Sequence, residues 1–364
     1  IAPSGLTLRG VATRALEVPL TFTLGTSAAV VRAVPLLLVD VSTEQGVVGR
    51  TYLFCYTRAG ARAVALLIAE AVELVKGQQV HPQTIQQALL RRFALLGVAG
   101  PVRMALSALD IALWDAVGIA AGLPLTELLG AERRPIRAYD SRGLGLMAPA
   151  RLAEEAEALL RKGMRALKLR LGYPTLEDDL NALSAVRSNI PDDVAIMVDY
   201  NQALTTTEAI RRGLALQAEG IEWLEEPIRH DDYEGNARIA RALDAPLQIG
   251  ENFNGPEAMA TAIAAQACDL VMPDVARIGG ATGWMQAAGI AVAHGIRVST
   301  HLVPETSIHL LAATATAHWL EYVDWADAIL DEPLNVADGN VIPPDRPGWG
   351  LAWSETKIAR LDPL

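Results

Sequence analysis

The sequence predicts an α/β fold in which an eight-fold β/α barrel carries an α+β capping domain at its N-terminal side. From Pro135 onward, short nonpolar runs of β character alternate with polar or glycine-containing turns and with amphipathic segments of helical length. The chain has 364 residues, whereas one such barrel takes about 250, so a second domain is expected. We expect the capping domain at residues 1–133, the barrel at 134–330, and a segment that returns to the capping domain at 331–364.

The capping domain is expected to contain three strands followed by three helices. Its first nonpolar runs resemble strands, and Gly46 suggests a turn between the second and the third. The strands are expected at Leu6–Val18, Leu36–Val41 and Val47–Tyr52, and the helices at Ala61–Val75, Thr84–Phe93 and Val102–Val117.

The barrel is expected to follow as eight strands separated by helices such as Ala150–Lys162, Thr207–Glu219 and Gly283–His294. In a parallel barrel the active site lies at the carboxyl ends of the strands, so polar residues there are the candidates for chemistry. The expected strands are Ile136–Tyr139, Ala166–Arg170, Ala195–Asp199, Glu222–Glu225, Leu247–Gly250, Leu270–Met272, Arg297–Thr300 and Trp319–Glu321.

Charge and composition argue against several classes of partner. The chain has 31 basic and 42 acidic residues, a formal charge of −11, and no basic run that could follow a phosphate backbone, so nucleic acid is not expected. The nonpolar stretch Met104–Leu125 is interrupted by Asp110 and Asp115, and no signal-peptide pattern is present. We expect a cytoplasmic protein that acts on a small molecule without a membrane partner, in which Cys55 and Cys268 are buried residues without a role.

Three acidic residues follow consecutive expected strands. Asp199, Glu225 and Glu251 are each 26 residues from the next, which is about the length of one β/α unit, so their carboxylates should converge. Converging carboxylates repel one another, and a hard divalent cation such as Mg²⁺ relieves that repulsion. Each acid taken alone is equally well explained as a helix cap, but three in register favour a metal site.

Further polar residues end the neighbouring strands. Lys168 and Arg170 are two residues apart, so both face the same side of a strand, and the barrel mouth is the less costly side for two cations. Asp274 and His301 end the sixth and seventh strands, where a carboxylate beside an imidazole makes a general base. Glu321 ends the eighth strand, where we expect a protonated carboxyl that donates to developing negative charge.

At this point the sequence resembles the enolase superfamily, and within it the mandelate racemase subgroup. The resemblance covers nearly the whole chain through "ALDIALWDAVGIAAGLPLTELLG", "KLRLGYP", "MVDYNQ", "EEP", "GEN", "MPD", "RIGGATGW" and "HLLAATATAHWLE" in family order. It implies a modified TIM-type barrel and a homo-oligomer, such as an octamer.

The resemblance also implies roles for individual residues. Asp199, Glu225 and Glu251 would bind Mg²⁺, the Asp274–His301 pair would be one acid/base, and Glu321 would hydrogen-bond the substrate carboxylate. Lys168, Asn201 and Ser141 would assist in holding that carboxylate and the ligands. The family usually has Lys-x-Lys on the second strand, and Arg170 replaces the second lysine here. A guanidinium is a poor proton acceptor near neutrality, so racemisation with two bases is in question.

Three functions remain open from the sequence. The first is a racemase-like enzyme on a 2-hydroxy acid related to mandelate, which the nonpolar lid Thr21–Val30 and the aromatic residues Tyr52, Phe54 and Tyr56 suit. The alternative is an acid-sugar dehydratase with His301 as its base, in which Glu305 or Tyr56 recognises a polyol. The third is a Mg²⁺-dependent carboxylate binder that has lost turnover through Arg170.

Overall fold

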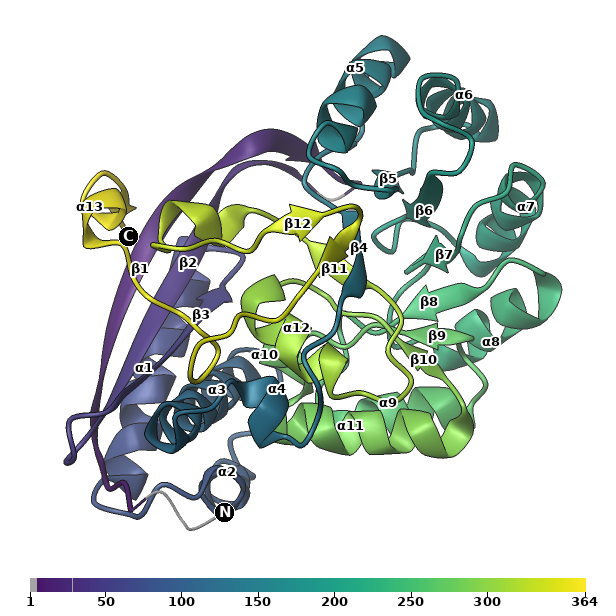
Figure 1. The fold of residues 1–364 in the computed structure, drawn as a ribbon. Helices are drawn as coiled ribbons and strands as arrows, with labels where there is room; N and C mark the ends of the chain where they lie inside the picture. The colour runs from purple at the N-terminus through teal and green to yellow at the C-terminus, as the bar shows by residue number, and fades with distance from the viewer. Residues whose placement is uncertain (1–4, 28) are drawn as a thin grey trace.

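The computed structural model describes residues 5–27 and 29–364. Figure 1 shows an antiparallel sheet with helices on one face, placed beside a ring of parallel strands. The sheet has the strand order β14-β1-β2-β3. The first elements of the chain are β1 (Leu8–Gly25), β2 (Val30–Thr43), β3 (Val48–Phe54), α1 (Arg58–Val75), α2 (Pro82–Arg92) and α3 (Pro101–Ala121).

The helix α3 joins the sheet to the barrel. It is long and nonpolar enough to cross a membrane, but 72% of its most nonpolar window is buried in the protein, which is typical of a core helix. Asp110 on this helix accepts hydrogen bonds from the backbone and hydroxyl of Thr282 on α11. Asp115 accepts hydrogen bonds from the backbone N–H groups of Arg50 and Trp349. The two buried acids of α3 therefore connect this helix to β3, to α11 and to the C-terminal segment.

The barrel strands occur where the sequence predicts them, with ends that differ by at most two residues. Strands β4 to β10 pair in parallel in chain order, and β11 pairs with β4. Backbone bonds from Val298 to Thr316, and from Thr300 to Trp319, close the ring between β10 and β11. The strands are β4 (Ile136–Asp140), β5 (Ala166–Arg170), β6 (Ala195–Asp199), β7 (Leu224–Glu225), β8 (Leu247–Ile249), β9 (Leu270–Val271), β10 (Arg297–Val298) and β11 (Leu320–Tyr322).

Helices follow the barrel strands, and several of them are amphipathic. On α5, for example, Leu152, Ala156 and Leu159 recur at helical spacing and are all buried. The short helix α4 (Leu125–Leu128) precedes the barrel and was not expected from the sequence. The helices between and after the strands are α5 (Pro149–Leu160), α6 (Leu176–Arg187), α7 (Thr206–Gln217), α8 (Tyr233–Ala242), α9 (Pro256–Ala264), α10 (Val275–Ile278), α11 (Gly280–His294) and α12 (Pro304–Ala312).

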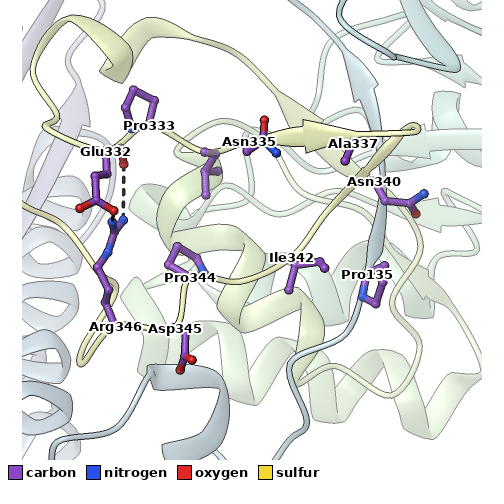
Figure 2. A pocket seen from close by; sticks show the side chains of 11 residues that line it. Pro135, Glu332, Pro333, Asn335, Ala337, Asn340, Ile342, Pro344, Asp345 and Arg346 are labelled. Atoms are coloured by element: carbon purple, nitrogen blue, oxygen red, sulfur yellow. Dashed lines mark hydrogen bonds and ion pairs between the residues drawn. The ribbon is translucent and has the colours of Figure 1, made fainter.

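The C-terminal segment contacts both parts of the molecule. After the 3-10 helix η1 (Trp325–Ala328) and β12 (Val336–Ala337), strand β13 (Asn340–Val341) pairs with β4 of the barrel. The chain then reaches α13 (Glu355–Ile358) and β14 (Asp362–Pro363), which pairs with β1. Between these contacts the segment lines a cavity of about 510 Å³ that contains the Arg346–Glu332 ion pair (Figure 2).

The segment expected to form a lid, Thr21–Val30, is mostly the end of a β-hairpin. Strand β1 continues to Gly25 and β2 begins at Val30, while residue 28 lies outside the described residues. At the hairpin tip, the hydroxyl of Ser27 donates to the backbone carbonyls of Tyr200 and Asn201 at 3.3 and 3.2 Å. The tip therefore lies against the loop that follows β6, at the carboxyl ends of the barrel strands.

Candidate active site

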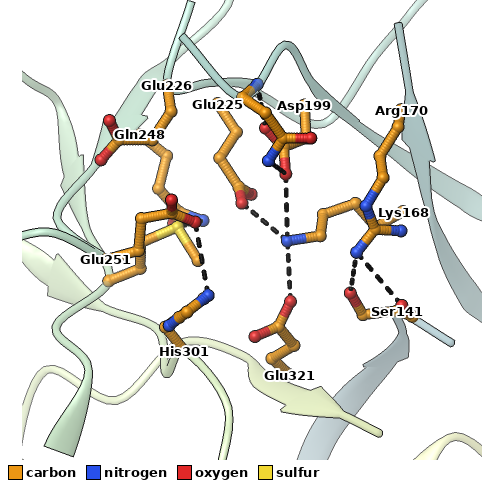
Figure 3. Close-up of polar contacts among 12 residues, drawn as sticks. Ser141, Lys168, Arg170, Asp199, Glu225, Glu226, Gln248, Glu251, His301 and Glu321 are labelled. Carbon is orange, nitrogen blue, oxygen red and sulfur yellow. Dashed lines mark hydrogen bonds and ion pairs between the residues drawn. The ribbon is translucent and has the colours of Figure 1, made fainter. Parts of the chain in front are cut away.

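The three expected metal ligands converge at the carboxyl ends of adjacent strands. Asp199 and Glu225 end β6 and β7 and lie opposite each other in the sheet register, and Glu251 follows β8 closely. One carboxylate oxygen from each lies within 4.8 Å of the others. Figure 3 shows the three side chains pointing toward one region, with Lys168 on its other side.

Lys168 carries the positive charge at the centre of this group. Its ammonium lies 2.7 Å from Glu225 Oε1, 2.7 Å from Glu321 Oε1 and 3.4 Å from Asp199 Oδ2. Burial by itself would lower the pKa of Lys168, but the three carboxylates outweigh it and raise that pKa above its ordinary value. Lys168 is therefore a fixed cation in this site.

The acids beside Lys168 have more negative charge than one ammonium can balance. Burial, together with Asp199 and Glu321, raises the pKa of Glu225 to about 8 despite the opposing effect of Lys168. The neighbouring Glu226 is also fully buried, and burial and Glu251 raise its pKa well above the ordinary value. Sequence reasoning did not single out Glu226, although it is the second acid of the "EEP" motif. Its Oε1 accepts the backbone N–H of Gly250 at 2.8 Å and so supports the turn before Glu251.

His301 and Asp274 form the expected pair. The two residues face each other as a parallel bridge, and His301 Nδ1 lies 2.7 Å from Asp274 Oδ2. The Nε2 atom lies 3.3 Å from Glu251 Oε2. Burial lowers the pKa of His301, but Glu251, Glu321 and Asp274 together raise it to about 9. With Nδ1 donating to Asp274, Nε2 is the nitrogen left to exchange a proton with a ligand.

Glu321 differs from its expected state. Burial raises its pKa, but Lys168 and His301 outweigh burial and bring the pKa to about 2, so this carboxyl is ionised rather than protonated. Its second oxygen accepts the backbone N–H of Leu302 at 2.8 Å. The expectation of a protonated donor was wrong here because the ammonium of Lys168 lies in direct contact with the carboxylate.

Arg170 faces the mouth beside Lys168 but is engaged by the loop after β4. Its guanidinium donates to the carbonyl of Gly143 at 2.9 Å, and to the carbonyl and hydroxyl of Ser141 at 3.2 and 2.9 Å. Arg170 and Ser141, both expected in the site, are thus joined to each other (Figure 3). These partners are neutral, so the charge of Arg170 is available to a substrate anion.

Two of the other expected contacts lie at the edge of the site. Asn201 has a positive φ of 44° and donates its backbone N–H and side-chain amide to Asp199, so it orients that carboxylate. Tyr56 is half exposed, and its ring lies against the guanidinium of Arg277. The hydroxyl of Tyr52 instead donates to the carboxylate of Glu305 at 2.5 Å, and both side chains are buried. Glu305 therefore binds Tyr52 in this structure, where the sequence had suggested a contact with a polyol substrate.

Family models match almost all of the chain. The N-terminal domain of the mandelate racemase / muconate lactonizing enzyme family matches residues 9–130, and the enolase C-terminal domain-like model matches residues 151–357. The chain belongs to the mandelate racemase / muconate lactonizing enzyme family. It is therefore a member of the enolase superfamily and an enzyme, and its fold is the capped, TIM-type barrel of that superfamily.

Relatives within this family include solved structures and enzymes of known activity. An enolase from the alpha proteobacterium BAL199, solved with bound magnesium, is 41% identical with a TM-score of 0.96, covering 98% of this chain and 100% of that one. An enolase from Bradyrhizobium, complexed with magnesium and mandelic acid, is 40% identical with a TM-score of 0.93, covering 99% of both chains. L-talarate/galactarate dehydratase from Salmonella typhimurium is 32% identical over 88% of this chain and 81% of that enzyme.

As in other members of the family, the cofactor is Mg²⁺. The site fits this ion, because three carboxylate oxygens within 4.8 Å of one another supply the hard ligands that Mg²⁺ prefers. Burial, and then the charges of Asp199 and Glu321, raise the pKa of Glu225, and a bound cation would offset both effects. Asp199, Glu225 and Glu251 would therefore hold the metal, with Asn201 orienting the first of them.

Proposed function

We propose that this enolase-superfamily enzyme is an acid-sugar dehydratase that uses His301 as its base. The observation that carries the proposal is the position of Arg170, whose guanidinium is bound by Ser141 and Gly143 on the face where a second base is expected. A guanidinium stays charged at neutral pH and accepts protons poorly. A reaction that needs one proton acceptor therefore suits this site better than one that needs two.

The proposed reaction begins at the carbon next to the substrate carboxylate. Nε2 of His301 accepts the α-proton, while Asp274 holds Nδ1–H and stabilises the imidazolium that forms. The electron pair of the broken C–H bond moves into the carboxyl group and gives an enediolate. The enediolate then expels the β-hydroxyl, which leaves as water with the proton returned by His301. The resulting enol rearranges to a 2-keto-3-deoxy acid, so one water is lost and nothing is oxidised overall.

Positive groups must hold the charge that this enediolate develops. Bound Mg²⁺ supplies a Lewis acid at the carboxylate end. Lys168, which is 2% exposed, and Arg170, which is 5% exposed, supply cations from strand β5 that are shielded from solvent. Because both charges are in place before reaction, they stabilise the enediolate without reorganisation.

Several relatives support a dehydratase. The enzyme from Salmonella typhimurium is named for talarate and galactarate, and a relative from Saccharolobus solfataricus, 28% identical over 85% of this chain, is an arabinonate dehydratase. A second candidate is a racemase-like reaction on a 2-hydroxy acid, which the mandelic acid complex of the Bradyrhizobium enolase favours. That reaction requires a group other than Arg170 to act on the second face.

The test is a screen of Mg²⁺-loaded protein against six-carbon acid sugars and against both enantiomers of mandelate. Formation of a 2-keto acid, detected as its semicarbazone, supports the dehydratase, and His301→Asn should abolish it. Inversion of mandelate with α-deuterium uptake in D₂O would replace the proposal by a racemase. If these acids bind but neither reaction occurs, the result would favour the third function, a Mg²⁺-dependent carboxylate binder. We further propose a cytoplasmic homo-oligomer, whose size light scattering on the purified chain would measure.

A further inference from the structure

One cation at the barrel mouth has no role in the chemistry above. Arg277 lies in α10, three residues after Asp274. Its Nη1 donates to Asn252 Oδ1 at 2.8 Å, and Asn252 Nδ2 donates to Glu251 Oε1 at 3.0 Å. Through these contacts Arg277 lies about 8 Å or less from the metal-binding carboxylate of Glu251.

Arg277 forms no ion pair with a carboxylate among the described residues, although Asp274 and Glu251 lie near enough for their charges to raise its pKa. Among the residues that the structure describes, its hydrogen-bonding side chains are the neutral Asn252 and Tyr56, and its guanidinium lies 4.7 Å from the centre of the Tyr56 ring. Its Nε is buried and has no hydrogen-bond partner within residues 5–27 and 29–364. By contrast, Arg142 at the same end of the barrel is bound by Asp140 and Asp324. A partly buried cation with an unused donor is suited to bind an anion from outside the protein.

Two helix N-termini also lie beside Arg277. A cavity of about 260 Å³ lies against Arg277 and Tyr56, where the capping domain meets the barrel. It is also lined by Thr57 and Gly100, the N-cap residues of α1 and α3. The N-terminal ends of helices carry partial positive charge, so the field of both helices adds to that of the guanidinium.

We propose that Arg277 binds the distal carboxylate of the substrate and that the substrate is a dicarboxylic acid sugar; this inference rests on the proposed function. A six-carbon chain places its two carboxyl carbons about 6 Å apart. One carboxylate can therefore lie at the Mg²⁺ site while the other reaches the guanidinium. The ring of Tyr56 packs against the guanidinium of Arg277 and orients it. The planar N–H groups of a guanidinium match the two oxygens of a carboxylate. Arg277 thus determines specificity for diacids over monoacids.

The experiment compares six-carbon diacids with monoacids of the same stereochemistry, such as galactarate with galactonate. For Arg277→Met we expect kcat/KM for the diacid to fall about 10- to 150-fold, mainly through KM, with little change for the monoacid. Arg277→Lys should recover part of the loss, because it keeps the charge without the fork. Arg229→Met is the matched control, since Arg229 follows β7 on the same rim but is exposed and paired with Asp231.

Equal losses for diacid and monoacid would overturn the proposal, because they would mean that Arg277 acts only through Asn252 and Glu251. A wild-type enzyme that prefers the monoacid would overturn it as well. Calorimetry of the same ligands with Mg²⁺-loaded His301→Asn, with and without Arg277→Met, separates the two proposals. If no 2-keto acid forms from any substrate but the diacid binds more tightly in an Arg277-dependent way, dehydration fails while the diacid site stands.

Discussion

The guanidinium of Arg170 donates to the hydroxyl of Ser141 at 2.9 Å, which joins the ends of strands β5 and β4 on the face opposite His301. Proton exchange should therefore be one-sided. For a 2-hydroxy acid without a β-hydroxyl, we expect the enantiomer whose α-proton faces His301 to exchange in D₂O, and its mirror image to exchange far more slowly. Proton NMR of each enantiomer of mandelate measures both rates.

Arg170→Lys should add exchange on the slow face, because an amine near other cations can be neutral at the pH of the assay. Ser141→Ala is the control, since it removes one partner of Arg170 but supplies no base. Equal rates for the two enantiomers in the wild-type enzyme would show that an effective base already acts on the second face.

The Asp274–His301 pair should be indispensable. His301→Asn removes the proton acceptor, so we expect turnover to fall about 10²- to 10⁴-fold. Asp274→Asn should also lower kcat strongly, because the 2.7 Å contact with Nδ1 fixes the tautomer. His294→Asn, at the end of α11, should leave turnover unchanged. Normal α-proton exchange in His301→Asn would place the base elsewhere.

Glu225→Gln should weaken Mg²⁺ binding at least about 10-fold, because it removes one of three converging carboxylates. Glu222→Gln is a suitable control, since Glu222 lies three residues earlier on the same segment and outside the cluster. Titration of the metal-free variants by calorimetry gives both affinities. An unchanged affinity in Glu225→Gln would exclude this residue as a ligand.

Mg²⁺ binding should release protons near neutral pH. In the metal-free enzyme the pKa of Glu225 is about 8 and that of His301 about 9, so both groups are largely protonated at pH 7. The metal favours the carboxylate form of Glu225 and offsets the charge of Glu251 that raises the pKa of His301. Both pKa values should therefore fall on binding, and affinity should be lost as the pH falls from about 8 to 6. Calorimetry at pH 7 in buffers of different ionisation enthalpy measures the proton release, which Glu225→Gln should reduce.

Two glycines should respond oppositely to alanine. A Cβ on Gly49 in β3 would lie 1.9 Å from the carbonyl oxygen of Ala112 on α3, so Gly49→Ala should destabilise the protein by about 1–3 kcal/mol. Gly289 lies within α11, and a Cβ there would meet nothing within 4 Å, so Gly289→Ala should stabilise by about 0.5–1 kcal/mol. Urea denaturation of both variants checks the sign of each change.

The sequence by itself determined the order of elements and the position of the acids. The strand β5 spans Ala166–Arg170 as expected, because a short nonpolar run between turns carries its own signal. The regular spacing of Asp199, Glu225 and Glu251 likewise placed them on consecutive strand ends. In both cases the information lies within one β/α unit, so local pattern was sufficient.

The tertiary structure alone decided which side chains are partners. Glu321 is ionised because closure of the barrel places it against Lys168, more than 150 residues earlier in the chain. In the same way the contact with Ser141 engages Arg170, and the capping domain brings Tyr56 against Arg277. Such contacts join residues whose separation follows no sequence period, and the protonation and charge balance of each group depend on distances of a few ångströms. The acids, the lysine and the histidine at the strand ends could therefore be named from the sequence, whereas Glu226, Arg277 and the charge state of each group required the folded barrel.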